Sequence, residues 1–533
     1  MEPVAFTPRW LAGDPVAVAL LPRAFDDPHA RAVAAGIAAE RAVDPAVLEA
    51  LAPVHPAQEA ARDALAAPGA VAVVTGQQAG LFGGPLYTLY KAAAAIVDAR
   101  QLAAETGRPC VPVFWLQNED HDYDEIASCT VLGPDGRTRT VTVPGDPADA
   151  GRSIAARRYP AAIGEAVDAI DAVIAGAPHA DAVVGLLRRA YTPGTSPDRA
   201  FRALIEALFA RHGLVVVDPS DPRIAAAARP VHRRAIDRAA AVSAAAQTRV
   251  DALRAAGIAV QVHVRPGAPL SFFHPDGPSG PRHRVEPRGD TAGGGDADRD
   301  GFRLVGADRV VPRDTVLAGW CSTSALLRPI LQDTLLPTVA YVGGPGEIAY
   351  FAQLPPIYAA FDLAMPLVVP RARFRVVDDP ARRLLDRLGL TVDRLGEPRD
   401  RLLGERGGEG PDPDAIARAL VGASTELLDR FAAEADPSGA APADLERAIA
   451  KTRATIARAA GRLAGRYRRI RASRDEVAVD RLDRLLARLR PDGQPQERVL
   501  GWPTFGARYG DAFVDAILAA VVPFDGSERE LRP

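Results

Sequence analysis

The sequence predicts an α/β protein with a parallel sheet covered by helices, followed by a C-terminal α-helical coiled coil. Two segments, 71–105 and 338–350, each join an apolar strand, a glycine-containing loop and a helix. The first leads into a second apolar strand at 111–116, and strand, helix and strand in about 45 residues form a βαβ crossover between parallel strands. Further along, apolar residues recur every seven positions, as is typical of a coiled-coil seam: Ile449, Ile456, Leu463, Ile470 and Val477.

Composition places the chain among globular proteins of several domains. Its 533 residues exceed one ordinary core, and 48% hydrophobic and 25% charged residues are common globular values. The 64 basic and 67 acidic residues give a net charge of −3, which argues against a nucleic-acid partner. Three cysteines without a CxxC pair exclude a disulfide framework and a thiolate zinc site. Without a long apolar run or a signal peptide, we expect a cytoplasmic protein with no membrane partner.

The first predicted strand, 71–74, is followed by a loop at 75–84 and a helix that begins near Pro85 and runs to about Glu105. Four glycines punctuate the loop: Gly76, Gly80, Gly83 and Gly84. They allow backbone amides to approach an anion at the positive end of the helix, although a tight turn with close helix packing explains them as well. The spacing matches neither a P-loop nor a GxGxxG motif.

Lys91 is unusual because lysine occurs only here and at position 451, and every other cation is arginine. A retained lysine suggests a need for a compact, mobile ammonium. Lys91 lies about two helical turns after Pro85. If its side chain turns back to the strand end it can pair with a phosphate or carboxylate, and otherwise it is solvated.

The second strand, 111–116, ends close to the most polar segment of the chain: Glu119, Asp120, His121, Asp122, Tyr123, Asp124 and Glu125. Ligands of open parallel sheets bind beyond the carboxyl ends of strands, which makes this run a candidate site. Mutual repulsion raises the pKa of some carboxylates, which suits a general base that takes a proton from an amine. Oxygen ligands for Mg²⁺ and a solvated acidic loop are the alternatives.

Further α/β structure follows. A helix at 197–212 precedes a strand at 214–217, and a helical stretch reaching 256 precedes a predicted strand at 258–264. The segment 275–300 has few large apolar residues and contains three consecutive glycines. It predicts a mobile surface loop without rigid chemistry.

A third strand, 338–342, leads into the loop Gly343-Gly344-Pro345-Gly346 and a helix that opens with Glu347. The loop offers a second set of backbone donors, and Glu347 with Tyr350 can bind an ammonium or sugar hydroxyls, although helix capping alone explains Glu347. Arg328, which follows the polar segment 320–324, can hold a carboxylate through its guanidinium.

These elements predict four parts of the chain: a core at 1–377 with insertions near 140–200 and 265–310, a connector at 378–412, a helical coiled coil at 413–490, and a segment at 491–533 that returns to the core. A helix over 443–490 would be about 72 Å long, too long to pack wholly inside a small domain. Its seam favours a homodimer, while a hairpin with an upstream helix in the same chain is the alternative.

Several blocks of the sequence resemble one known family. Residues 74–91 are similar to the TGQQxGLFxGPLYTxxK signature of the BshC family, the cysteine-adding enzymes of bacillithiol biosynthesis. Further blocks match in the same order, at 112–115, 119–122, 328–329, 341–350 and 496–498. The resemblance covers nearly the whole chain and departs at 275–300 and 378–412.

The resemblance implies a Rossmann-like core, a coiled-coil dimerisation domain and a ligase that adds L-cysteine to the glucosamine amine of glucosaminyl-malate. It also implies a core similar to nucleotidyltransferases, and hence activation of the cysteine carboxylate by ATP with Mg²⁺. Activation is needed because hydroxide is a poor leaving group. No metal site made by the protein alone is expected.

The resulting hypothesis brings three loops into one crevice. Lys91 would stabilise charge on a phosphate or carboxylate, and the acidic run would position and deprotonate the amine through Glu119, Asp120, His121 and Asp122. Substrate or nucleotide binding is assigned to residues of the three loops and of the 320–328 segment: Thr75, Gly76, Gln77, Gln78, Gly80, Gly83, Gly84, Tyr87, Arg328, Gly343, Gly344, Gly346, Glu347 and Tyr350. Two other functions remain open, a metal-dependent hydrolase or transferase that uses the Glu119–Asp122 run, and a nucleotide-binding coiled-coil scaffold without catalysis.

Overall fold

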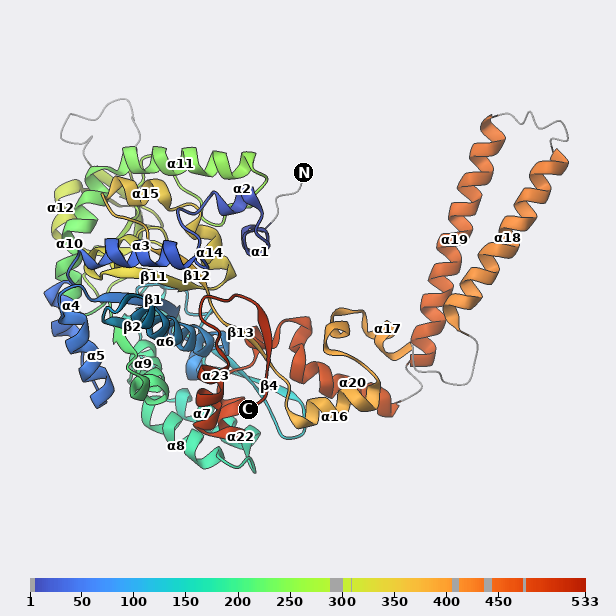
Figure 1. Cartoon of the computed structure of the whole chain (residues 1–533), viewed down its shortest axis with the longest axis horizontal. Coiled ribbons are helices and arrows are strands. Elements are labelled where there is room, and N and C mark those ends of the chain that lie inside the picture. Colours follow the sequence, from blue (N-terminus) through green and yellow to red (C-terminus); the bar gives the residue numbers. More distant parts are fainter. Residues whose placement is uncertain (1–4, 288–300, 308, 405–411, 436–442, 473–475) are drawn as a thin grey trace. The chain divides into compact units, whose positions relative to one another are not determined.

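The computed structural model describes residues 5–287, 301–307, 309–404, 412–435, 443–472 and 476–533. It separates into two compact units, the first formed by Met1–Val376 with Gln496–Pro533 and the second by Val377–Pro495 (Figure 1). Among the described residues, no helix has both the length and the apolar character needed to cross a bilayer.

A five-stranded parallel sheet forms the centre of the first unit, which confirms the predicted α/β fold. Its strands lie in the order β12 (Leu367–Pro370), β11 (Thr338–Gly343), β1 (Val71–Gln78), β2 (Cys110–Gln117) and β5 (Val215–Val217). Helix α6 (Tyr87–Thr106) connects β1 to β2. After β1, the chain adds β2 and β5 on one side of that strand and later adds β11 and β12 on the other side. The direction of strand addition therefore reverses between β1 and β11. Such a switch point is where open α/β sheets bind ligands.

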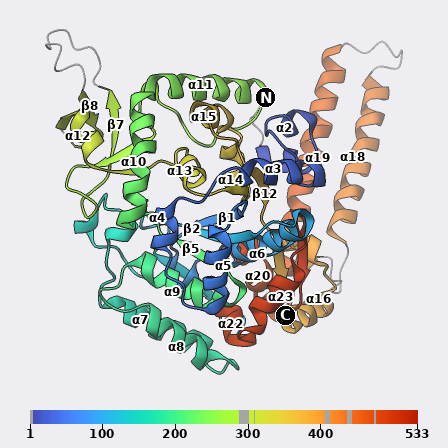
Figure 2. The same ribbon diagram turned by 60° about the vertical axis from the view of Figure 1, so that its left-hand side comes forward.

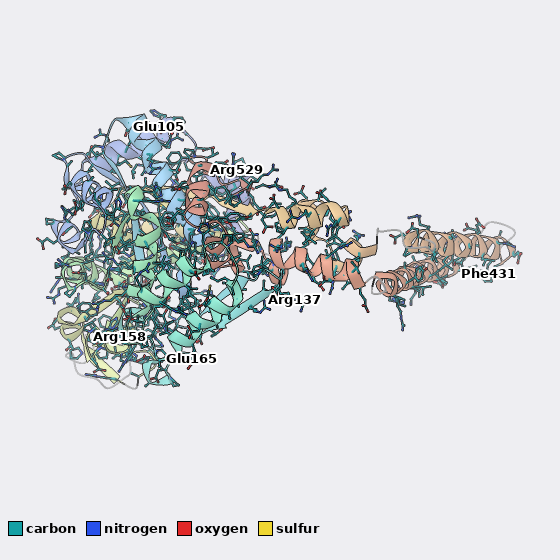
Figure 3. All side chains as sticks on the ribbon, turned by 90° about the horizontal axis from the view of Figure 1, so that it is seen from below. Glu105, Arg137, Arg158, Glu165, Phe431 and Arg529 are labelled. Atoms are coloured by element: carbon teal, nitrogen blue, oxygen red, sulfur yellow. The ribbon has the colours of Figure 1, made fainter. Side chains whose placement is uncertain are left out.

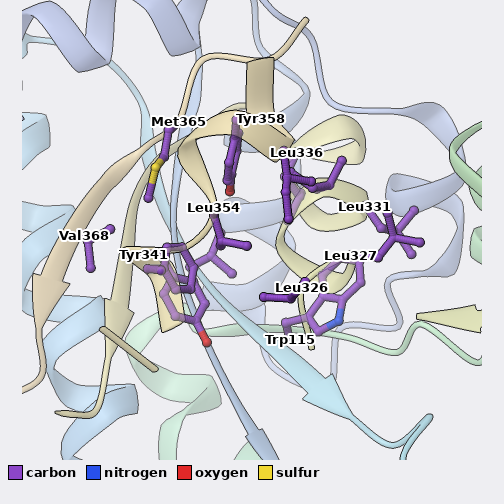
Figure 4. Close-up of a cluster of buried hydrophobic side chains, with 14 of the residues drawn as sticks. Trp115, Leu326, Leu327, Leu331, Leu336, Tyr341, Leu354, Tyr358, Met365 and Val368 are labelled. Carbon is purple, nitrogen blue, oxygen red and sulfur yellow. The ribbon is translucent and has the colours of Figure 1, made fainter. Parts of the chain in front are cut away.

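The strands are apolar throughout because both faces of the sheet are covered. Trp115 of β2 belongs to a core cluster with α13 (Arg328–Leu335), α14 (Pro345–Phe351) and α15 (Pro355–Ala360). Figure 4 shows Trp115 with Leu331 of α13 and Tyr358 of α15. Its neighbour Phe114 points to the opposite face and packs against Phe201 of α9 (Pro197–Phe209), with ring centroids 5.9 Å apart. Figures 1 and 2 accordingly show α6 and α9 on one side of the sheet and α15 on the other.

Strand β1 is longer than predicted. Residues 75–78, expected in a loop, continue the strand and pair with β2. The glycine at 76 permits this pairing, because a Cβ at that position would lie 2.8 Å from the Trp115 carbonyl oxygen. The polar side chains at 77 and 78 therefore stand on a rigid strand end.

Two further expectations were wrong. The described residues 258–264 form no strand, because the backbone N–H and C=O of Val262 bond to the side chain of Gln353 instead of a neighbouring strand. The segment 275–300 is not simply a surface loop, since β7 (His283–Pro287) lies within it; residues 288–300 fall outside the described part. The predicted helical stretch to 256 divides at Arg238 into α10 (Pro222–Asp237) and α11 (Ala239–Ala255).

A second sheet of five antiparallel strands contains β7. Its order is β10 (Trp320–Thr323), β6 (Ser271–His274), β7, β8 (Gly301–Leu304) and β9 (Arg309–Pro312). The other elements of the first unit are α1 (Phe6–Leu11), α2 (Pro15–Val18), α3 (Pro28–Ala39), α4 (Pro45–Ala50), α5 (Pro56–Ala66), β3 (Ser128–Leu132), β4 (Thr138–Thr142), α7 (Ala162–Ile174), α8 (Ala180–Ala190), α12 (Arg313–Ala318), β13 (Arg373–Val376), α21 (Gln496–Val499), α22 (Pro503–Tyr509), α23 (Ala512–Ala520) and β14 (Glu528–Leu531).

The second unit is helical. It contains α16 (Asp379–Leu388), α17 (Arg399–Gly404), α18 (Pro413–Ala435), α19 (Ala443–Ala472) and α20 (Glu476–Leu489). Leu482 and Leu485 of α20 are fully buried in a cluster with α16. Helices α18 and α19 form a hairpin, with Phe431 near the end of α18 (Figures 1 and 3). The predicted helix over 443–490 thus corresponds to α19 and α20, between which residues 473–475 lie outside the described part.

A buried carboxyl group in α6 predicts a pH-dependent stability. Asp98 is 1% exposed and accepts a hydrogen bond of 3.0 Å from the Phe524 backbone N–H. Burial raises the pKa of Asp98 to about 7, so the folded protein holds a proton that the unfolded chain releases. The contribution of Asp98 to stability is therefore fully present below its ordinary pKa of 3.8 and is lost as the pH rises through about 7.

We expect Asp98→Asn to stabilise the protein by about 1–3 kcal/mol at pH 8 and to change little at pH 4, because asparagine keeps the acceptor oxygen without the buried charge. Urea unfolding of both proteins at the two pH values measures this. An equal effect of the substitution at both pH values would contradict it.

Candidate active site

A cavity of about 360 Å³ opens at the carboxyl edge of the central sheet. The ends of β1, β2, β11 and β12 each contribute to it, together with residues around β10, the turn before β7, and α21. Its lining consists of Gln77, Gln78, Tyr87, Lys91, Trp115, Leu116, Gln117, Glu119, Asp120, Arg282, Thr323, Ser324, Ala325, Arg328, Gly344, Pro345, Gly346, Glu347, Tyr350, Arg371 and Arg498.

The structure brings most of the predicted residues together in this cavity. Those that line it are Gln77, Gln78, Tyr87, Lys91, Glu119, Asp120, Arg328, Gly344, Gly346, Glu347 and Tyr350. Those that lie outside its lining are Thr75, Gly76, Gly80, Gly83, Gly84, His121, Asp122 and Gly343. The three loops therefore share one crevice, but the glycines of the first loop do not reach it.

The loop at 80–84 is a tight turn, which was the alternative explanation of its glycines. The N–H of Gly83 donates to the Gly80 carbonyl oxygen and the Tyr191 hydroxyl, and the N–H of Gly84 donates to the Leu81 carbonyl oxygen. Gly83 and Gly84 have positive φ angles of 93° and 67°, and a Cβ on Gly80 would lie 2.8 Å from the Gly84 Cα. The sequence suggested that these amides could bind an anion. Because they already have partners, they are not free to do so.

Thr75, Gly76 and Gly343 have structural contacts behind the cavity. The Thr75 hydroxyl donates to the Val342 carbonyl oxygen across the β1–β11 pair. The Gly76 carbonyl oxygen accepts from Lys91, and that of Gly343 accepts from the Arg371 backbone N–H. These bonds hold the strand ends that carry the polar side chains.

The side chain of Lys91 turns back to the end of β1, which was one of the two orientations considered from the sequence. Its Nζ lies 2.7 Å from the Gly76 carbonyl oxygen and 3.0 Å from Gln77 Oε1, and it forms an ion pair with Glu347. The side chain is 2% exposed, and burial lowers the pKa of Lys91 while the Glu347 charge opposes that change. An anionic ligand would therefore share Lys91 with Glu347.

Glu347 also joins a network that encloses Arg328. Its carboxylate accepts from the Gly344 N–H at 2.9 Å, which caps α14, and from the Tyr341 hydroxyl at 2.6 Å. The Arg328 guanidinium donates to the Tyr341 and Tyr350 hydroxyls at 3.1 and 2.6 Å. Among the described residues, Arg328 thus forms no ion pair with a carboxylate. Its hydrogen bonds link α13 to β11 and α14.

Glu119 has the properties expected of a general base. Its carboxylate accepts hydrogen bonds from the Thr323 hydroxyl and, at 3.2 Å, from the Thr323 N–H. Burial raises the pKa of Glu119, and the Thr323 hydrogen bonds only partly oppose that rise. A carboxylate whose proton affinity is increased by burial and whose orientation is held by strand β10 suits proton abstraction. Burial, rather than the repulsion proposed from the sequence, is the main cause.

The pKa of Asp120 shifts in the opposite direction from that of Glu119. Burial would raise its pKa, but hydrogen bonds with His121 and the charge of Arg282 outweigh it and lower the pKa well below the ordinary value. Arg282 donates to Asp120 Oδ1 at 2.6 Å and to His121 Nδ1 at 2.9 Å, so His121 sits beside the cavity and supports its rim. Asp122 is exposed outside the lining.

Three arginines of the site were not foreseen. Arg282 lies in the segment dismissed as a surface loop, and its guanidinium stacks on the Phe272 ring at 4.3 Å. Arg371 follows β12 and forms a bidentate pair with Glu497, with both N···O distances 2.7 Å. Arg498 comes from α21. The one available signal for Arg498 was the block at 496–498, to which no function had been assigned.

The residue set gives no support to a metal site built by the protein alone. Within the described ranges, no group of three or more His, Cys, Asp or Glu side chains is arranged to hold a metal ion.

Comparisons with known proteins agree along most of the chain. The description "Bacillithiol biosynthesis BshC, N-terminal Rossmann-like domain" matches residues 46–372, and the corresponding C-terminal coiled-coil domain matches residues 374–529. A protein of Salinibacter ruber named "Putative cysteine ligase BshC" is 33% identical over 462 residues, which cover 85% of this chain and 81% of that protein. A protein of the same name from Symbiobacterium thermophilum is 32% identical over 506 residues, covering 91% and 88%.

Proposed function

Because this chain belongs to the BshC family of cysteine ligases in bacillithiol biosynthesis, we propose that its cavity joins the carboxyl group of L-cysteine to the glucosamine amine of glucosaminyl-malate. The family assignment favours this reaction over a hydrolase or a non-catalytic scaffold. The reaction forms one C–N bond, breaks one C–O bond of the cysteine carboxyl group, whose oxygen leaves with the activating group, and requires that the amine lose a proton.

The observation that carries the proposal is the position of Glu119 in the same cavity as the charged groups at the ends of β1 and β11. An amine attacks an acyl carbon only when its lone pair is free, and Glu119 would accept the proton that the nitrogen loses. Lys91 and the Arg328 network carry positive charge along the same cavity, and oxygen atoms acquire negative charge as the acyl carbon is attacked. These two features of the cavity support amide formation as the proposed reaction.

We further propose that ATP with Mg²⁺ activates the cysteine carboxylate. When bound, ATP would supply a phosphate-containing leaving group in place of hydroxide. The donor set fits the anionic part of such a substrate, since five cations line the cavity: Lys91, Arg282, Arg328, Arg371 and Arg498. Mg²⁺ held through nucleotide phosphates needs only one or two protein carboxylates, and Asp120, whose pKa is lowered, is ionised at neutral pH.

The experiment that tests the function is a reconstituted assay. Purified full-length protein is mixed with L-cysteine, glucosaminyl-malate and ATP with Mg²⁺, and mass spectrometry follows the thiol product. Omission of each component in turn shows which are consumed. Well-folded protein that forms no product in the complete mixture would refute the proposed reaction.

We also propose that two chains associate through the second unit. The long side chains of its helical hairpin are widely exposed: Leu427 is 60% exposed and Leu463 53%. In contrast, the small Ala460 and Ala464 of α19 are buried. A seam whose large residues remain exposed within one chain is suited to a second copy.

Replacing Leu463 and Ile470 together with lysine is expected to convert a dimer of the full chain into a monomer, because two charges per chain would enter an apolar seam. Light scattering after size-exclusion chromatography measures the mass. Ala454→Lys, an exposed position on another face of α19, is the matched control and should leave the mass unchanged. A monomeric wild-type protein would contradict the proposal.

A further inference from the structure

The five cations that line the cavity differ in whether they have an ionic or hydrogen-bond partner. Three of its five cations pair with carboxylates: Lys91 with Glu347, Arg282 with Asp120, and Arg371 with Glu497. A fourth, Arg328, is buried and bonded to tyrosine hydroxyls. Arg498 is the remaining cation, and it is exposed to the cavity without a hydrogen bond or ion pair to any residue that the structure describes.

Tyr87 provides a second free group in the same place. It lies in the first turn of α6 and lines the cavity, and its hydroxyl likewise has no hydrogen-bond partner in the described ranges. Tyr87 and Arg498 line the same cavity. Burial raises the pKa of Tyr87, and the positive charges of Arg498 and Arg371 partly oppose that rise. The Arg371 guanidinium stacks on the Tyr87 ring at 5.5 Å and limits its orientation.

The backbone around these two side chains is held by the C-terminal return of the chain. The Leu86 N–H donates to the Leu500 carbonyl oxygen at 2.9 Å, and Pro85 forms a bridge with Gly501. The carboxamide of Gln496 accepts from the Val376 N–H at 2.8 Å and donates to the Val376 carbonyl oxygen at 3.0 Å. The position of the Arg498 backbone is therefore set from both sides along the chain.

Glu497 completes this support. Its side chain is 3% exposed, and both carboxylate oxygens pair with the Arg371 guanidinium. In the block Gln496-Glu497-Arg498, the first residue thus anchors a strand and the second forms a buried ion pair. The third extends into the cavity a guanidinium that has no hydrogen bond or ion pair among the described residues. A cation whose backbone is held by buried contacts, and whose head has no partner, is preorganised for a ligand.

We propose that Arg498 and Tyr87 form an anion subsite of this cavity that binds a carboxylate or phosphate oxygen of a substrate. A guanidinium and a phenol donate hydrogen bonds that a carboxylate or phosphate accepts, and neither group here has to leave another partner first. The proposed function supplies two sources of this chemistry, the malate carboxylates and the ATP phosphates, and the inference rests on that function for the choice of probes.

Titration calorimetry of the full-length protein with glucosaminyl-malate and, separately, with ATP and Mg²⁺ tests the subsite. Arg498→Ala is expected to weaken binding of at least one probe by about 10- to 100-fold. Arg498→Lys should bind that probe with an affinity between those of the wild type and Arg498→Ala, and Tyr87→Phe should bind it about a few-fold more weakly than the wild type. Arg189→Ala, an exposed arginine on α8 outside the cavity, is the matched control. Thermal unfolding of each variant verifies that the fold is kept.

A loss confined to glucosaminyl-malate assigns the subsite to a carboxylate, and a loss confined to ATP assigns it to a phosphate. Binding of both probes by Arg498→Ala as tightly as by Arg189→Ala would overturn the subsite, as would a wild-type protein that binds neither. A wild-type protein that binds a probe in an Arg498-dependent manner but forms no cysteine product would refute the ligase reaction and leave the subsite standing.

Discussion

Replacing Glu119 with glutamine is expected to lower kcat/KM for amide formation by about 100- to 10,000-fold, the range typical of a lost general base. Glutamine keeps the size of the side chain and an oxygen that can accept from the Thr323 N–H and hydroxyl. The variant therefore loses the proton acceptor while the contact with β10 is kept. The assay described for the wild-type protein gives the rates.

The pH profile separates this role from a structural one. Because burial raises the pKa of Glu119 above its ordinary value of 4.5, wild-type kcat/KM should rise with pH as the carboxylate ionises and then level off. Glu119→Gln should lack that limb. Asp124→Asn, an exposed carboxylate in the same acidic run but outside the cavity lining, is the matched control and should keep both rate and profile. A Glu119→Gln enzyme with the wild-type rate would exclude Glu119 as the base.

The second large effect is on stability. Glu497→Ala should destabilise the first unit by about 3–5 kcal/mol, because it leaves the Arg371 charge buried without its partner. Both side chains are 3% exposed, and Arg371 lies beside the ends of β11 and β12. Urea unfolding, followed by far-UV circular dichroism, measures the change.

Two comparison variants show whether the loss comes from the unpaired charge. Arg371→Met combined with Glu497→Leu removes both charges and should be less destabilised than Glu497→Ala alone. Glu530→Ala breaks an exposed pair with Arg532 and should change the stability by less than about 1 kcal/mol. A Glu497→Ala protein as stable as Glu530→Ala would show that the buried pair contributes little.

Local patterns predicted four of the five strands of the parallel sheet, all except β12, and part of the site. The apolar runs at β1, β2 and β11 and the helix between the first two identify a parallel crossover, and parallel strands place their carboxyl ends at one edge. That rule was enough to bring Gln77, Glu119 and Gly344 to the same cavity, since each lies at or just beyond a strand end.

The same patterns gave wrong predictions for polar groups whose hydrogen-bond or charge partners lie far away in the sequence. Glycines 80–84 have the composition of an anion-binding loop, but Tyr191 and the turn itself use their amides. The pKa values of two neighbours in the acidic run shift in opposite directions: burial outweighs the Thr323 hydrogen bonds and raises the pKa of Glu119, whereas His121 and Arg282 outweigh burial and lower the pKa of Asp120. Neither Thr323 nor Arg282 is near the run in sequence.

Periodicity and blocks of neighbouring residues were enough to predict the parallel crossover, the coiled-coil unit and the family. The ionisation and the pairing of the side chains in the cavity became known from the folded chain. Several ion pairs of the cavity join groups more than 100 residues apart, such as Arg371 with Glu497 and Arg282 with Asp120. Electrostatic free energies depend on those distances and on exclusion of water, and no local pattern encodes either of them.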